Sequence, residues 1–376
     1  MTRYRISPTF VTEAKEVVAG TISNREDSSI SNTRRSWLGM QSLINKSVTA
    51  ASTFNNSNVG GIVSTYSLVY TVGNAYASGV LSVNGDVHFV PYNANVGQRI
   101  SSTGVVSTYS LVYTTGNAYY EGALLPNGEI HFIPRSAAVG QKVSANGVVS
   151  TYSLVYTTSD AYAGGVLATN GDIHFIPLNA VVGQKIAADG TVSTYSLAYT
   201  TTTAYAGGVL SPTGEIHFIP FSANRGQKIS ANGVVSTYSL VYTNSAGAYS
   251  GGGLSSNGDI HFVPFSADRG QKISIDNIVS TYSLVYTTTG AYVGGTLAPN
   301  GDIHFSQRAA VVGQKITSTG IVATYSLAYT TSPGYNGGVI TPNGELHFVP
   351  LAATVGQKIS TLPAVPFSPA LCRGIR

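Results

Sequence analysis

The sequence has very little cysteine, tryptophan and charge. Of 376 residues, one is Cys, one is Trp, and 10% are charged, against about 25% in ordinary globular domains. The single Cys372 has no intramolecular partner, which excludes a disulfide scaffold. No apolar run approaches the roughly 20 residues that cross a bilayer, and the N-terminus lacks the apolar core of a secretory signal. We therefore expect neither membrane insertion nor export through a signal peptide.

Glycine, tyrosine and a regular set of histidines are what the chain has instead. It contains 42 Gly, 24 Tyr and 7 His, and every His is followed by Phe. Successive histidines lie 43 residues apart, with one spacing of 44; they are His88, His131, His174, His217, His261, His304 and His347. A fixed period of this length indicates a repeat architecture. We expect a non-repeating arm (1–60), seven units (61–360) and a short tail (361–376).

Each unit has the pattern of four short β-strands. Residues 104–114 alternate and are rich in Val, Ser, Thr and Tyr, whereas 204–214 contain a Gly-Gly pair, 215–220 the His-Phe pair and 226–230 the segment GQKIS. In several copies Asn-Gly joins the Gly-Gly strand to the His-Phe strand, which is a strong hairpin signal because both residues tolerate φ > 0. Four strands in about 43 residues match one blade of a β-propeller.

The phase of the repeats favours a closed ring over an open solenoid. The first copy begins with a spare STYS strand and the last copy lacks one, so pairing Val63–Tyr70 with Gly356–Ser360 completes a seventh blade. An open solenoid needs atypical capping repeats, and the terminal copies are regular. We predict an all-β fold: a seven-bladed β-propeller of four-stranded blades, with the Gly-Gly strands inside, the STYS strands at the outer edge, and an irregular or partly helical arm.

The segments AYVGGTLAPNGDIHF (291–305) and GYNGGVITPNGELHFVP (334–350) carry a family resemblance. They resemble a short-period propeller repeat of the form Tyr-x-Gly-Gly-x-Leu-x-Pro-Asn-Gly-x-Ile-x-x-Ile-Pro, and related repeats occur in tailed-phage virion proteins and in proteins of algae and protists. The resemblance covers about 300 residues. It implies a propeller and, more weakly, a virion component. The sixth copy departs from it at Ser306, Gln307 and Arg308.

The repeated polar residues have a structural interpretation. We expect each His to hydrogen-bond a Tyr or Ser hydroxyl across its blade, because no second His or Cys stands at ligand spacing. We therefore predict no metal site and no cofactor. One acid follows the turn in each copy (Asp86, Glu129, Asp172, Glu215, Asp259, Asp302, Glu345), and one cation follows the Gln (Arg99, Lys142, Lys185, Lys228, Lys272, Lys315, Lys358). These rings could be charge pairs at strand ends or parts of repeated sugar-binding pockets.

An enzyme site would be a unique group of residues that breaks the sevenfold regularity. The unique residues are Glu121, Arg135, Asp160, Asp189, Arg225, Asp268, Arg269, Asp276, Gln307 and Arg308, and they are scattered singly along the chain. Their spacing indicates no nucleophile–base pair and no glycosidase-like acid pair. We predict no catalytic residues and no enzyme. Nucleic-acid binding is not expected either, because the repeats carry 11 basic and 12 acidic residues.

The arm is the part of the chain that does not repeat. Residues 7–20 and 32–48 could each form a short helix, and the second contains an apolar and basic set: Arg34, Arg35, Trp37, Leu38, Met40, Leu43 and Ile44. The arm has no evident core of its own, so it needs a surface to pack on. We predict that these residues anchor the protein to an assembly or to sister chains; the alternative is that the arm packs on its own propeller.

These observations lead to a functional hypothesis. We expect a non-enzymatic structural protein of a phage particle, whose arm docks on other virion proteins while the propeller serves as a decoration, neck or tail-fibre, or adhesion module. The expected location is therefore the virion. The alternative is a lectin-like propeller with repeated inter-blade sites for host-surface glycans, which would gain avidity from multivalency. A host intracellular scaffold is a third, less favoured hypothesis.

Overall fold

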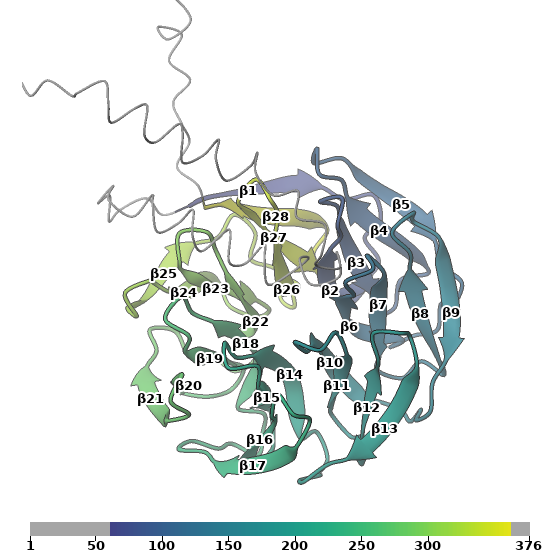
Figure 1. Ribbon diagram of the computed structural model, residues 1–376. Helices are drawn as coiled ribbons and strands as arrows, with labels where there is room; N and C mark the ends of the chain where they lie inside the picture. The colour runs from purple at the N-terminus through teal and green to yellow at the C-terminus, as the bar shows by residue number, and fades with distance from the viewer. Residues whose placement is uncertain (1–60, 362–376) are drawn as a thin grey trace, which may run out of the picture.

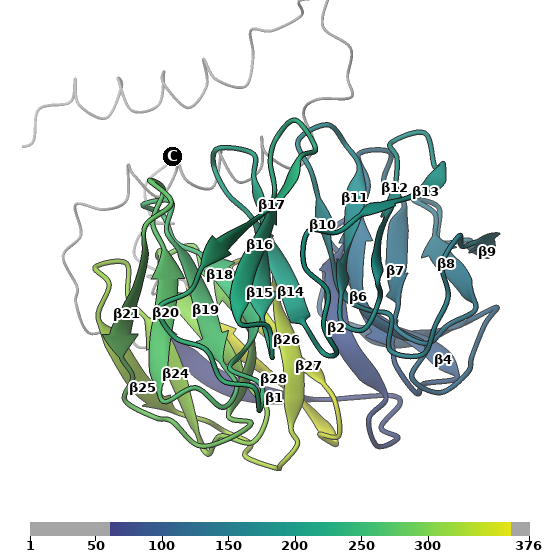
Figure 2. The same cartoon turned by 90° about the horizontal axis from the view of Figure 1, so that it is seen from below.

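A computed structural model describes residues 61–361 of the chain. Within that range the backbone forms seven four-stranded antiparallel sheets arranged as blades around one axis (Figure 1). The side view shows the blades standing next to one another as a thick ring (Figure 2). The predicted seven-bladed propeller is thus confirmed, and neighbouring blades contact each other mainly through their innermost strands.

The two strands nearest the axis are the Gly-Gly strand and the His-Phe strand. The innermost strands are β2 (Tyr76–Leu81), β6 (Tyr119–Leu124), β10 (Tyr162–Leu167), β14 (Tyr205–Leu210), β18 (Tyr249–Leu254), β22 (Tyr292–Leu297) and β26 (Tyr335–Ile340). The second strands are β3 (Val87–Pro91), β7 (Ile130–Pro134), β11 (Ile173–Pro177), β15 (Ile216–Pro220), β19 (Ile260–Pro264), β23 (Ile303–Gln307) and β27 (Glu345–Pro350).

The third and outermost strands complete each blade. The third strands are β4 (Val96–Ile100), β8 (Val139–Val143), β12 (Val182–Ile186), β16 (Arg225–Ile229), β20 (Arg269–Ile273), β24 (Val312–Ile316) and β28 (Val355–Ser360). The outermost strands are β5 (Val106–Ser110), β9 (Val149–Ser153), β13 (Val192–Ser196), β17 (Val235–Ser239), β21 (Val279–Ser283), β25 (Val322–Ser326) and β1 (Ile62–Ser67).

Closure of the ring occurs as the repeat phase predicts. Strand β1 pairs antiparallel with β28, with Ile62 opposite Ser360 and Ser67 opposite Val355. The seventh blade therefore combines the first strand of the described chain with its last three. This joint ties the two ends of the propeller together and leaves no open blade in the ring.

The packing inside a blade explains why its sequence repeats so closely. In the first blade the Tyr76 ring lies 5.5 Å from the Phe89 ring, and its hydroxyl donates to the Val96 carbonyl oxygen at 3.0 Å. A Cβ atom on Gly97 would lie 2.2 Å from the Tyr109 ring of the outer strand, so only glycine fits beneath that tyrosine. All seven blades have this arrangement of Tyr, Phe and Gly.

A buried glutamine joins each blade to the segment that enters it. In the third blade, Gln184 is fully buried, and its Oε1 accepts hydrogen bonds from the Val155 and Tyr156 amides at 3.0 and 2.8 Å. Those two residues belong to the connection between β9 and β10. The repeated glutamine therefore satisfies two backbone donors that would otherwise be left without a partner in the irregular part of the chain.

Several predictions about the ends of the chain lie outside the described residues. These are the two helices of the arm, the tail, and the anchoring residues Arg34, Arg35, Trp37, Leu38, Met40, Leu43 and Ile44. In the part of the chain that the structure covers, no helix is long and apolar enough to span a membrane.

Candidate functional site

The repeated polar groups form the same local arrangement in each blade. Lys185 Nζ lies 2.7 Å from Asp172 Oδ2, and equivalent cation–acid pairs occur in the other six blades. The histidines lie beside these pairs. His88 Nδ1 is 3.2 Å from the Tyr109 hydroxyl, whereas His131 Nε2 is 3.4 Å from Glu129 Oε2. The acid and cation rings are therefore intrablade ion pairs at strand ends.

The environment of the histidines does not suit acid–base work near neutral pH. Burial is the main cause that lowers the pKa of all seven to about 4, so they are neutral at pH 7. Over residues 61–361, no three His, Cys, Asp or Glu side chains gather in a way that could hold a metal ion. The seven histidines pack against tyrosine rings at centroid distances of 5.2 to 5.6 Å.

The blades differ strongly at the residue that follows each His-Phe strand. Its carbonyl oxygen accepts a backbone hydrogen bond from the start of the next blade, as between Arg135 and the Ala161 amide at 2.7 Å. These seven positions therefore form a ring around one end of the axis, which we call the axial rim. They are Tyr92, Arg135, Leu178, Phe221, Phe265, Arg308 and Leu351.

One side of the axial rim is built around Arg135. Its guanidinium carbon lies 5.5 Å from the centre of the Tyr92 ring and 4.8 Å from that of the Tyr120 ring. Its Nε donates to Asp160 Oδ1. Asp160 has a φ of 52°, a backbone conformation that Asp tolerates better than most residues. The charge of Arg135 is thus neutralised by a carboxylate from the next blade.

The other side of the rim is built around Arg308. Its guanidinium carbon lies 5.3 Å from the centre of the Phe265 ring, which is in turn 5.3 Å from the Phe221 ring. Arg308 forms no ion pair with any residue in the described range. Burial raises the pKa of Tyr92, and the positive charges of Arg135 and Arg308 act against that rise.

A second ring of equivalent residues lies deeper along the innermost strands. Its members are Ser78, Glu121, Gly164, Gly207, Gly251, Gly294 and Gly337. The backbones approach so closely here that a Cβ on Gly251 would lie 2.7 Å from Gly294 Cα. The register of each innermost strand also shifts at this point. Glu121 is thus the one charged side chain among these seven positions.

The Glu121 carboxylate reaches across to the neighbouring blade. Its Oε2 accepts a hydrogen bond at 3.1 Å from the amide of Gly165, which lies in β10 of that blade. Burial raises the pKa of Glu121 to about 7, although the hydrogen bond from Gly165 acts against this rise. A carboxyl with this pKa exchanges protons near neutral pH, which suits a general base or acid.

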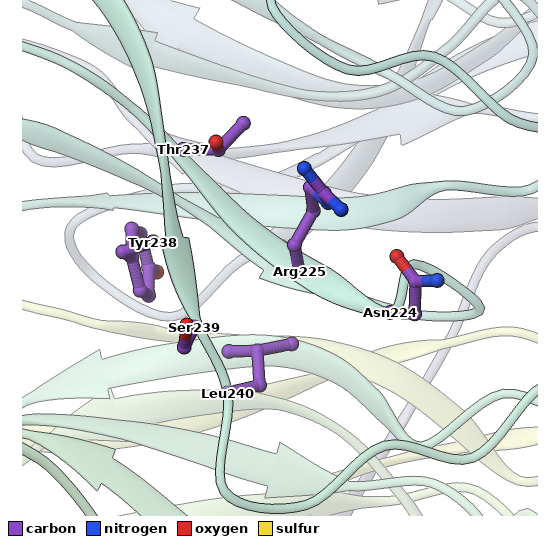
Figure 3. A pocket seen from close by; sticks show the side chains of 6 residues that line it. All are labelled: Asn224, Arg225, Thr237, Tyr238, Ser239 and Leu240. Atoms are coloured by element: carbon purple, nitrogen blue, oxygen red, sulfur yellow. The ribbon is translucent and has the colours of Figure 1, made fainter.

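A separate hollow occurs on the outer part of the fourth blade (Figure 3). It is shallow and is lined by Asn224, Arg225, Thr237, Tyr238, Ser239 and Leu240. Arg225 stacks over the Tyr199 ring at 5.3 Å, and the buried Tyr238 has a pKa raised beyond its ordinary value by desolvation. The Tyr238 hydroxyl is therefore not poised to transfer a proton near neutral pH, and this hollow is a weaker candidate than the axial end.

The structure brings together some of the unique residues that look scattered in the sequence. Arg135 pairs with Asp160, and Arg308 lies on the same rim. Gln307 fixes the segment before Arg308, because its Nε2 donates to the Tyr329 carbonyl oxygen at 2.9 Å. The remaining residues lie on third strands or on turns beside them: Asp189, Arg225, Asp268, Arg269 and Asp276.

Sequence reasoning missed the aromatic part of this site. Tyr92 and Tyr120 are two of the three tyrosines that do not follow the repeat, and Phe221 and Phe265 occupy the same position as Tyr92, at which the other blades have Leu or Arg. The signal that could have found them is a column comparison of the seven copies. The residue after the His-Phe strand varies in size, charge and aromaticity, while the residues before it hardly change.

No protein-family model matches this sequence, and none of the curated proteins is similar to it. Solved propellers are similar in structure. A streptogramin B lyase is 22% identical with a TM-score of 0.70, and the match covers 79% of this chain and 97% of the lyase. Virginiamycin B lyase from Staphylococcus aureus is 18% identical with a TM-score of 0.70, over 80% of this chain and 99% of that one. A catalytically inactive variant of the latter, with quinupristin, is equally similar.

These findings correct the functional hypothesis drawn from the sequence. The phage structural role is contradicted, since the similar propellers named above are lyases and nothing supports a place in a phage particle. The prediction that the protein is not an enzyme is contradicted on the same ground. The lectin-like alternative and the virion location receive no support. At 18–22% identity the likeness shows the fold, and the WD40 propeller of Doa1, with 11% identity and a TM-score of 0.61, shares it.

The prediction of no enzyme relied on the spacing of the unique residues along the chain and not on their positions within the seven blades. A sevenfold ring brings equivalent positions of all its blades close to the axis, whatever their separation in sequence. Arg135 and Arg308 are separated by four blade lengths and still lie on one rim. Spacing rules for catalytic pairs therefore do not apply to this fold.

Proposed function

We propose that this protein is a propeller enzyme of the lyase type, with its active site at the axial end and Glu121 as the base that removes a proton from the substrate. The observation that carries the proposal is positional. Some of the residues that break the sevenfold repeat lie toward the axis: Glu121 is on an innermost strand, and Arg135 of the axial rim lies over the ring of the adjacent Tyr120. The likeness to propellers that are lyases supports the same class of chemistry.

The proposed step is an elimination that starts at the Glu121 carboxylate. Glu121 takes a proton from a carbon atom of the substrate, the C–H electron pair forms a C=C bond, and the bond to the leaving group breaks with its electrons. The proton then passes from the Glu121 carboxylic acid to the leaving group or to water. The balance needs no water, oxidant or reductant. A pKa near 7 suits both proton transfers, because the Glu121 carboxylate must first accept a proton and then release it.

The backbone beside Glu121 could assist this step. The Gly165 amide donates a hydrogen bond to Glu121 of the neighbouring blade. The equivalent positions of other innermost strands are also glycine, for example Gly208 and Gly252. Fixed amide donors next to a base stabilise negative charge that develops on a substrate carbonyl oxygen during proton removal.

The test is breakdown of quinupristin, the compound present with the inactive lyase variant, in water enriched in oxygen-18. Products are followed by liquid chromatography and mass spectrometry. The wild-type protein should form products without oxygen-18, because elimination adds no water. Glu121→Gln should be slower by about 100-fold or more, which is the usual contribution of a general base.

Asp189→Asn is the matched control, since it removes an exposed carboxylate in a turn away from the axis. Its rate should equal that of the wild type. Incorporation of oxygen-18, equal rates for Glu121→Gln and the wild type, or intact quinupristin in every sample would each contradict the proposal.

A further inference from the structure

The two arginines of the axial rim differ in how their charge is used. Arg135 lies between two tyrosine rings and donates to the Asp160 carboxylate. Arg308 lies over one face of Phe265, and no carboxylate within the described range pairs with it. An aromatic face attracts a cation but accepts none of the in-plane hydrogen bonds that a guanidinium donates. The hydrogen-bonding capacity of Arg308 is therefore open to another molecule.

The backbone holds Arg308 firmly in place. Its amide donates to the Ala291 carbonyl oxygen at 2.8 Å, and its carbonyl oxygen accepts from the Gly334 amide at 2.7 Å. The preceding Gln307 is fully buried, and its Oε1 accepts a hydrogen bond from Gln357 Nε2 at 3.2 Å. The other six blades have Pro at the position that Gln307 occupies in the sixth copy. A cation on a fixed backbone loses little freedom when a ligand binds.

An aromatic surface adjoins this cation. The Phe265 and Phe221 rings meet at 5.3 Å with an interplanar angle of 54°. Phe221 rests against Gly247, where a Cβ atom would come within 2.5 Å of the ring. Both phenylalanines are only half-buried. Half-exposed aromatic rings beside a cation favour a flat apolar group linked to an anionic one.

From this juxtaposition we infer that Arg308, Phe265 and Phe221 form a subsite for a small ligand in which a single anionic group stands next to an aromatic ring. The anion pairs with the Arg308 guanidinium and the ring packs on the two phenylalanines. The inference rests on the proposed function only in assigning this ligand to the substrate, because the subsite itself is defined by the rim residues. Arg135 does not compete for the anion, since Asp160 already neutralises it.

The test is equilibrium binding of defined probes to the full chain, measured by titration calorimetry. The probes are 3-phenylpropionate, its cationic counterpart 3-phenylpropylamine, its ring-free counterpart propionate, and phenyl phosphate. Phenylpropionate should bind saturably, and phenylpropylamine and propionate should each bind at least tenfold more weakly. Phenyl phosphate distinguishes the sources of the anion: tighter binding than phenylpropionate identifies a phosphate ligand, and weaker binding a carboxylate.

Variants locate the site. Arg308→Gln should weaken phenylpropionate binding at least tenfold, and Phe265→Leu about threefold, in line with the loss of a charged hydrogen bond and of a ring contact. Arg269→Gln is the matched control, because Arg269 also stacks on a tyrosine, at 5.0 Å, but lies on a third strand. It should bind like the wild type. No saturable binding, equal binding by Arg308→Gln, or equal binding of the amine would overturn the subsite.

The two proposals fail in different ways. Glu121→Gln should abolish quinupristin breakdown yet keep phenylpropionate binding within about threefold of the wild type. Probe binding that depends on Arg308, in a protein that breaks down nothing, supports the subsite and refutes the lyase. Breakdown with a KM that is unchanged in Arg308→Gln supports the lyase and refutes the assignment of the subsite's ligand to the substrate, whereas the subsite itself is refuted by the absence of probe binding that depends on Arg308.

Discussion

The body of the propeller and its axial rim follow opposite rules. In the body, each blade repeats the same Tyr, Phe, Gln and His contacts and one ion pair between third and second strands. On the rim, equivalent positions hold Tyr92, Arg135, Phe265 and Arg308 beside leucines. Repetition in this protein therefore stabilises the packing of the blades. A residue present seven times has a packing role, and a residue present once at the axis is a candidate for chemistry.

The first prediction concerns acid, which should affect all copies of the body together. The folded pKa of each buried histidine is about 4, below the ordinary value of 6.5. The folded protein favours the neutral form of each histidine. This form is fully populated above pH 6.5, and the free energy of unfolding decreases as the pH falls toward 4. At pH 5 each histidine costs about 2 kcal/mol, and seven together, at about 14 kcal/mol, reach the upper end of the roughly 5–15 kcal/mol that stabilises a typical domain.

We therefore expect the propeller to unfold cooperatively near pH 5, as followed by circular dichroism. Return to pH 7 is the control for reversibility. A spectrum that stays native at pH 4 would show that the histidines can be protonated inside the blades.

The second prediction concerns a single packing contact of the body. A methyl group on Gly226 would lie 2.1 Å from the Tyr238 ring, whereas one on Gly73 meets nothing within 4 Å. Gly226→Ala should lower the free energy of unfolding by about 3 kcal/mol or more, and Gly73→Ala by less than about 0.5 kcal/mol. Urea denaturation measures both, and equal stability of the two variants would remove the packing explanation for the repeated glycine.

The third prediction concerns Glu121 and has the opposite pH dependence. Its folded pKa of about 7 is raised above its ordinary value of 4.5, so its contribution to stability is present below pH 4.5 and is lost as the pH rises through 7. Glu121→Gln should therefore be more stable than the wild type by about 3 kcal/mol at pH 8. At pH 6, where the folded wild-type carboxyl is mostly protonated but the unfolded one is ionised, the gain should fall to about 2 kcal/mol.

Urea denaturation at the two pH values tests this, with Asp189→Asn as the control that changes little at either. A gain of the same size at pH 6 and pH 8 would mean that Glu121 does not titrate in this range.

The fourth prediction has the smallest effect on stability. Arg308 forms no ion pair with other described residues and is only half-buried, so Arg308→Gln should change the free energy of unfolding by less than about 0.5 kcal/mol. Arg135→Gln should cost about 2 kcal/mol, because it leaves Asp160 without its partner beside two aromatic rings. Thermal denaturation of both variants checks the difference. Equal losses would erase the distinction between a structural and a free arginine.

Much of the fold could be predicted from the sequence, because each level of the pattern agrees with the next. The spacing of His88, His131 and the later histidines gives the number of blades, and the spare strand at Val63 gives the closure. The Gly-Gly pairs place the innermost strands, since only small residues fit where backbones converge. The outermost strands are shorter than predicted. Strand β5 ends at Ser110, because the chain then turns toward the next blade.

The site was only partly predictable. Glu121, Arg135, Asp160 and Arg308 stand out as exceptions to the repeat, but their placement around one axis depends on the curvature of the ring, which no local pattern encodes. The pKa of Glu121 depends equally on burial that arises only when seven blades close. The anchoring role of the arm (1–60) stays a prediction, because that segment lies outside the described residues.

The central claim is that the chemistry resides at the axial end and depends on the charge state of Glu121. The most direct test is the pH dependence of kcat/KM for quinupristin breakdown between pH 5.5 and 8.5. We expect the rate to rise with a midpoint near pH 7, as the Glu121 carboxyl loses its proton and becomes a base, and to vanish in Glu121→Gln. A profile that is flat across pH 7, or one that Glu121→Gln reproduces, would contradict the claim.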